Sequence, residues 1–115
     1  MGNSELSDIA ERLRGFARER DWEQFHTPKN LAASVAIEAG ELQEIFQWLS
    51  DEQARNLNAD QIANAREELA DVAIYLIRLA DQLGVDLGEA ITKKIATNNL
   101  RYPADVVRGT SGKRP

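Results

Sequence analysis

The run LAASVAIEAGEL, residues 31–42, is apolar almost all the way round a helix. A second run of the same character, LADVAIYLI, covers residues 69–77. Helices that are apolar on several sides are buried by neighbouring elements instead of lying on a solvated surface. The two runs therefore predict an all-α protein built around two buried helices.

Each run carries a pair of acidic residues, Glu38-x-x-Glu41 in the first and Glu68-x-x-Asp71 in the second. Acidic residues three apart stack on one face of a helix. With 19 acidic residues in 115, about three such pairs arise by chance, usually on a solvated face. Here the pairs interrupt apolar helices, where carboxylates are costly unless paired or metal-bound. Because carboxylates suit Mg²⁺, Mn²⁺ or Ca²⁺, we predict a metal centre for phosphate chemistry between two helices.

Composition limits the possible classes of protein. A chain of 115 residues is one small domain, and oligomerisation would help to complete its core. The absence of cysteine excludes disulfides, zinc-thiolate sites and a cysteine nucleophile. The net charge of −5 argues against nucleic-acid binding. No signal-peptide core or membrane-spanning run is present, so we expect a cytoplasmic protein with no membrane partner.

Helical periodicity and capping residues predict four helices, at about residues 5–20, 28–49, 59–83 and 87–100. The helix-boundary signals are Thr27 before Pro28, Asn58 with Gln61, Gly84, Asp86 with Glu89, and Pro103. The polar segment 50–58 is expected to be a loop or short turn. We expect a single domain over residues 1–103 and a basic, mobile tail over residues 104–115.

Three helices also present polar or aromatic stripes. Trp48 follows Glu41 by two turns, whereas Tyr75 and Arg78 continue the stripe that begins at Glu68. The last helix presents Lys94, Asn98 and Arg101. The segment between the first two helices holds Trp22, Phe25 and His26. Each feature also has an ordinary explanation: core aromatics, surface cations or a packed loop histidine. Gly40, which is costly inside a helix, suggests that a backbone or ligand approaches there.

Two segments, EAGELQEIFQW at residues 38–48 and EELADVAIYL at residues 67–76, resemble the MazG-type nucleoside triphosphate pyrophosphohydrolases. Three more are similar to one branch of that family, the small dCTP pyrophosphatases. These are RDWEQFH at residues 20–26, Lys94-x-x-x-Asn98-x-x-Arg101-Tyr102-Pro103, and the basic tail. The resemblance covers nearly the whole chain, from about residue 6 to residue 113, in order and with compatible spacing.

This resemblance implies a four-helix, MazG-like all-α fold whose protomers assemble as a homo-oligomer, commonly a tetramer. It also implies Mg²⁺, with Mn²⁺ possible, and a role for each candidate residue. The metal ligands and catalytic carboxylates would be Glu38, Glu41, Glu68 and Asp71. Lys94, also catalytic, and Arg101 would contact the phosphates, with Tyr75 and Asn98 close to the sugar or phosphates. Trp22, His26 and Trp48 would surround the base.

The leading hypothesis is therefore a Mg²⁺-dependent hydrolase that converts a nucleoside triphosphate, dCTP or a related pyrimidine deoxynucleotide, to its monophosphate and pyrophosphate. A broader house-cleaning nucleotide pyrophosphatase is the alternative within the enzyme class. A helical interaction module with surface carboxylates is the alternative outside it. A di-iron carboxylate bundle needs Glu-x-x-His pairs, and the single histidine, His26, follows Glu23 at that spacing only in a loop segment.

Overall fold

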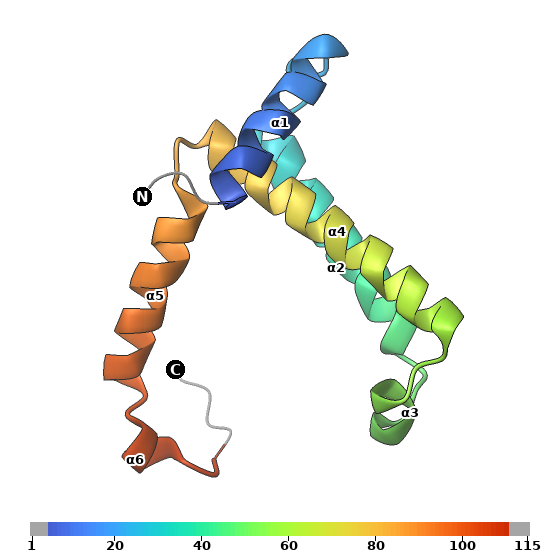
Figure 1. Ribbon diagram of the computed structural model, residues 1–115, viewed down its shortest axis with the longest axis vertical. Helices are drawn as coiled ribbons and strands as arrows, with labels where there is room; N and C mark the ends of the chain where they lie inside the picture. Colours follow the sequence, from blue (N-terminus) through green and yellow to red (C-terminus); the bar gives the residue numbers. More distant parts are fainter. Residues whose placement is uncertain (1–4, 111–115) are drawn as a thin grey trace.

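The computed structural model describes residues 5–110, and all regular secondary structure within them is helical (Figure 1). The prediction of an all-α protein is confirmed. The elements are α1 (Glu5–Glu19), α2 (Pro28–Phe46), α3 (Asp51–Arg55), α4 (Ala59–Gln82), α5 (Leu87–Arg101) and α6 (Ala104–Val107). The four longest correspond to the four helices expected from the sequence.

Helices α2 and α4 form the centre of the fold. They run side by side in opposite directions and make the most extensive contact between elements (Figure 1). Helix α1 packs on α4 near one end of this pair, and α3 lies at the other end. After α4 the chain turns, and α5 extends away from the pair while contacting α1. The four long helices therefore do not close a four-helix bundle within one chain.

The helix starts follow the predicted capping chemistry. The Thr27 hydroxyl accepts a hydrogen bond from the backbone N–H of Asn30 at 3.2 Å. Asn58 and Gln61 form the predicted capping box, with reciprocal side-chain-to-backbone bonds of 2.8 and 2.9 Å. Gly84 has a φ of 69°, the left-handed conformation that lets the chain leave α4 without a Cβ clash. These local signals fix the starts of α2 and α4 and the end of α4.

One boundary differs from the prediction. Helix α2 ends at Phe46, not near residue 49, and a turn follows in which the N–H of Leu49 bonds to the carbonyl of Phe46 at 2.9 Å. Ser50 and Gln53 then form a capping box that starts α3, a short helix in place of the predicted loop or short turn. Trp48 consequently lies in the turn after α2, so helical spacing from Glu41 does not set its direction.

The structure describes the first part of the predicted mobile tail, residues 104–110. Its first residues form α6, and the chain continues without regular structure to Thr110. The remaining positions, 111–115, lie outside the described residues. The division between a domain at 1–103 and a tail at 104–115 stays a prediction. Between residues 5 and 110, none of the helices combines the length and the apolar character that crossing a bilayer requires.

The core of a single chain is small. Its buried apolar residues lie between α1, α2 and α4: Ala17, Leu31, Ala65, Ile77 and Ala80. The accessible surface is 8770 Å², whereas a compact monomer of this mass exposes about 6,300 Å². The radius of gyration is 17.3 Å, against about 13 Å for a compact domain of this length. One chain therefore leaves a large surface uncovered.

Apolar side chains contribute much of this uncovered surface. Ile37 on α2 is 60% exposed and Leu69 on α4 is 57% exposed, although both belong to the apolar runs that predict burial. Leu100 on α5 is 82% exposed. Contiguous exposed apolar patches mark interaction surfaces in soluble proteins.

Candidate active site

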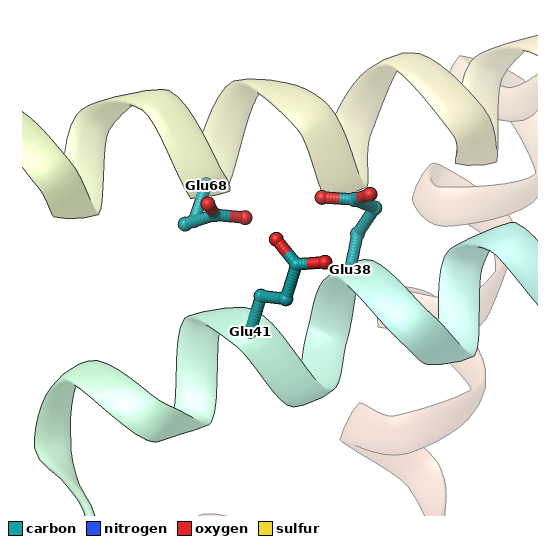
Figure 2. A group of neighbouring side chains, drawn as sticks. All are labelled: Glu38, Glu41 and Glu68. Carbon is teal, nitrogen blue, oxygen red and sulfur yellow. The ribbon is translucent and has the colours of Figure 1, made fainter.

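Three carboxylates meet where α2 and α4 lie against each other. Glu38 and Glu41 project from α2 toward Glu68 on α4, and Figure 2 shows the three side chains facing one another. One oxygen from each of the three lies within 4.8 Å of the other two. The spacing of three stacks the α2 pair on one face, and the antiparallel partner supplies the third group. The structure thus brings together three of the four carboxylates predicted to converge, and their role as a metal centre stays a prediction.

Glu68 is the α4 member of this carboxylate cluster. Burial raises its pKa, and the neighbouring charges of Glu41 and Glu38 raise it further. Its Oε1 atom is buried and has no hydrogen-bond partner within the described part of the chain. A buried polar oxygen without a partner is costly, and three converging carboxylates repel one another. A divalent cation would satisfy the oxygen and neutralise the charge, so these residues fit a metal site.

Asp71, the fourth predicted ligand, lies outside the group of three. It is one turn further along α4 from Glu68, and its charge still contributes to the raised pKa of Glu68. An open depression next to the cluster gives a ligand access to it. The depression is lined by Glu41, Glu44, Ile45, Asn64, Glu67 and Glu68. Coordination by Asp71 stays a prediction.

The predicted phosphate-binding residues do not reach the carboxylates of their own chain. Lys94, Asn98 and Arg101 all lie on α5 and are exposed. Helix α5 diverges from the α2–α4 pair, so its distal half lies far from the cluster (Figure 1). These side chains can meet the carboxylates only if α5 comes from another copy of the chain.

The predicted base-binding residues are likewise separated. Trp22 and His26 lie beside the start of α2, where the rings of Phe16, Trp22 and His26 contact edge to face, with centroids 5.8 and 6.3 Å apart. Trp48 follows the other end of α2 and is 85% exposed. A helix of 19 residues is about 28 Å long. One chain therefore cannot place Trp22, His26 and Trp48 around the same base.

Comparison with known proteins identifies the family. The MazG-like family model matches residues 33–113, which include both acidic pairs and α5. The chain belongs to the MazG-like family. The MazG-type resemblance seen in the sequence is thereby confirmed.

The relatives of this MazG-like chain include dCTP pyrophosphatase 1 from rat and from human. These are 46% and 44% identical to it over 110 residues, which is 94% of the chain. The match spans 65% of the length of each relative. A solved pyrophosphatase from Archaeoglobus fulgidus superposes with a TM-score of 0.81 at 38% identity, covering 88% of this chain and 94% of that protein. Most of this chain therefore shares its fold with that pyrophosphatase.

The structure adds an ionic network around one buried arginine that the sequence did not reveal. Arg78 on α4 is only 2% exposed and hydrogen-bonds to His26 and Asp81, and Asp81 is held in turn by Arg14 on α1. Sequence spacing placed Arg78 on the stripe of Glu68 and Tyr75 but gave it no role. The sequence feature that could have indicated this network is the pair Arg78 and Asp81, two opposite charges three residues apart within the apolar end of α4. His26, bonded to this network, is thus not part of the carboxylate cluster.

Proposed function

We propose that this MazG-like protein is a Mg²⁺-dependent nucleoside triphosphate pyrophosphohydrolase that converts dCTP, or a related pyrimidine deoxynucleotide, to the monophosphate and pyrophosphate. The convergence of Glu38, Glu41 and Glu68 at the α2–α4 interface carries this proposal. The similarity of 94% of the chain to dCTP pyrophosphatases indicates the substrate class. The cytoplasmic location expected from the sequence stays a prediction.

The carboxylate cluster supplies the ligands for the metal. Glu38, Glu41 and Glu68 would hold it, with Asp71 as the fourth carboxylate. Oxygen ligands alone favour Mg²⁺, and Mn²⁺ would be accepted by the same donors. A bound cation of this kind neutralises charge on phosphate oxygens and lowers the pKa of a coordinated water.

Side chains of the site carry out the proton transfer and stabilise the leaving group. A carboxylate of the cluster takes the proton of the attacking water, which adds to the α-phosphorus while the bond to the pyrophosphate oxygen breaks. Lys94 and Arg101 contact the phosphate oxygens, where their positive charges stabilise the departing pyrophosphate. Tyr75, half-buried one turn beyond Asp71, and Asn98 contact the sugar or phosphates.

We further propose that the active form is a homo-oligomer, a tetramer built from dimers, with sites shared between chains. The excess exposed surface and the exposed Ile37 and Leu69 support a partner on the α2–α4 pair. Apart from its own helical turn, no described residue lies within 4 Å of where a Cβ would stand at Gly40, so the approach expected there would also come from a partner or ligand. Helix α5, which carries Lys94, diverges from the α2–α4 pair, and this supports shared sites (Figure 1).

The base would be bound between two α2–α4 pairs from different chains, at the start of α2 in one chain and at the end of α2 in the other. Trp22 and His26 come from one chain, and Trp48 from another. Aromatic faces stack bases with about 1–3 kcal/mol each but do not demand one pattern of hydrogen bonds. The polar group of His26 or Asn98 would therefore provide discrimination.

A panel of nucleotides tests this substrate choice. With Mg²⁺ and equal, low concentrations of dCTP, dTTP, dATP and dGTP, release of pyrophosphate is expected to be fastest from dCTP. Replacing Trp48 by alanine should raise KM for dCTP about 5- to 100-fold, because one stacked aromatic face is lost, while kcat changes less. Faster hydrolysis of dGTP or dATP than of dCTP by the wild-type protein would rule out the pyrimidine assignment.

A further inference from the structure

The side chain of Arg78 is unusual in being a buried cation with fixed partners on both sides. Its Nε–H donates to Nδ1 of His26 at 3.1 Å, and its Nη1 donates to Oδ2 of Asp81 at 3.1 Å. The amide oxygen of Gln82, in the orientation that satisfies both groups, accepts from Nη2 at 3.0 Å. The guanidinium group is therefore held in one orientation.

Asp81 and Arg14 keep this buried cation in place. Arg14 donates two bonds to the Asp81 carboxylate, from Nε at 3.0 Å and from Nη2 at 2.7 Å. This fork geometry fixes the plane of the carboxylate, which lies between the two guanidinium groups. The pKa of Asp81 is lowered, chiefly by the hydrogen bond from Arg14, so the carboxylate stays charged. A buried arginine without such a counter-charge would be strongly destabilising.

This network determines which nitrogen of His26 carries the proton. An arginine has donors only and remains charged in proteins, so Nδ1 of His26 must act as the acceptor. A neutral imidazole whose Nδ1 accepts carries its proton on Nε2. Burial and, after it, the charge of Arg78 lower the pKa of His26, which agrees with a neutral ring. The ring is also restrained by its edge contact with Trp22.

The second nitrogen of His26 is available for a ligand. Among residues 5–110, its Nε2 has no hydrogen-bond partner. Arg78 lies seven residues after Asp71 on α4, which is about 10 Å of helical rise and nearly the same helix face. The imidazole, which is bonded to Arg78, thus lies beyond Asp71 as seen from the carboxylate cluster, toward the α1 end of the α2–α4 pair.

We propose that Arg78 is a positioning residue for nucleotide binding: it holds His26 in the neutral form with its proton on Nε2, so that Nε2–H is presented as a hydrogen-bond donor to a carbonyl oxygen of the base. Asp81 and Arg14 support this role by neutralising and orienting the Arg78 guanidinium. The inference rests on the proposed contact between His26 and the base. It adds that Arg78, which does not touch the nucleotide, determines which nitrogen of His26 carries the proton.

The tautomer of His26 can be measured without any nucleotide, because the chain contains one histidine. Long-range ¹H–¹⁵N spectra of the wild-type protein are expected to show a neutral ring protonated on Nε2, titrating below pH 6.5. Arg78→Met, which keeps the length but removes the donor and the charge, should give a mixture of tautomers and a higher pKa. Arg66→Met, an exposed arginine on the same helix, should leave both unchanged.

A wild-type ring protonated on Nδ1, or titrating above pH 6.5, would overturn the proposal even if Arg78→Met failed to fold. An unchanged tautomer and pKa in a folded Arg78→Met protein would overturn it as well. These spectra do not depend on hydrolysis, so failure of the proposed enzyme activity is distinguishable from failure of this network.

Steady-state kinetics then distinguish an Arg78 that positions His26 for the nucleotide from an Arg78 that only stabilises the fold. Arg78→Met should raise KM for dCTP about 3- to 10-fold with little change in kcat, the effect of losing one hydrogen bond to the ligand. His26→Ala should raise KM at least as much, and the double variant should resemble His26→Ala, because both act through one bond. An Arg78→Met protein with an altered tautomer and wild-type KM would refute the role in nucleotide binding, and so would additive effects in the double variant.

Discussion

Replacing Glu41 by glutamine is expected to reduce Mg²⁺-dependent hydrolysis of dCTP more than about 100-fold, while the protein stays folded and helical. Loss of even a residue that supports a metal ligand typically costs 10–100-fold, and Glu41 is proposed as a ligand itself. Asp71→Ala should have a comparable effect if Asp71 completes the site. Steady-state rates measured over a range of Mg²⁺ concentrations, together with far-UV circular dichroism, check both variants.

The same substitution should not destabilise the metal-free protein. Three converging carboxylates repel one another, and Glu41 is the largest charged contributor to the raised pKa of Glu68. Its neutral isostere is therefore expected to raise the thermal midpoint without metal and to reduce the stabilisation that Mg²⁺ gives. Glu52→Gln, an exposed carboxylate on α3, is the matched control and should change neither property. Near-normal turnover of both Glu41→Gln and Asp71→Ala would refute the metal centre.

Mixing two inactive variants is expected to restore activity. Glu41→Gln lacks a carboxylate on α2, and Lys94→Ala lacks the phosphate-binding cation on α5. If each site takes its carboxylates from one chain and its lysine from another, random exchange of an equal mixture makes about a quarter of the sites intact. Co-refolding the two variants and assaying pyrophosphate release measures this recovery directly.

The control is a mixture of Glu41→Gln with Glu68→Gln. Both substitutions remove a carboxylate from the same cluster. Every cluster in the mixture then lacks one carboxylate, so the mixture should remain inactive. Light scattering of the wild-type protein should give a mass above that of the monomer at micromolar concentration. A monomer mass, or no recovery in a mixture shown to contain mixed oligomers, would contradict sites shared between chains.

Much of the fold could be predicted from local chemistry. The apolar runs identified α2 and α4, and the capping residues Thr27 and Asn58 located their starts because each satisfies a free backbone N–H. The acidic spacing placed Glu38 and Glu41 on one face, and that face does meet Glu68. The helix starts and the shared face of Glu38 and Glu41 could be predicted because they depend on residues close together in one helix.

Features that depend on distant or separate segments could not be predicted in this way. Periodicity extended α2 past Phe46, and the capping box of Ser50 with Gln53, which starts α3, was missed. The bond between His26 and Arg78 joins residues 52 apart, and spacing along one helix carries no information about it. Nor does periodicity show that α5, the helix of Lys94, leaves the α2–α4 pair that carries the carboxylates (Figure 1).

The reaction itself is tested most directly by following oxygen from water into the products. Wild-type protein is incubated with Mg²⁺ and dCTP in water enriched in ¹⁸O, and the products are identified by ³¹P NMR and mass spectrometry. Attack at the α-phosphorus predicts dCMP carrying the label and unlabelled pyrophosphate, with no reaction once the metal is chelated. Formation of dCDP and phosphate, label in the pyrophosphate, or undiminished turnover without a divalent metal would contradict the proposed pyrophosphohydrolase.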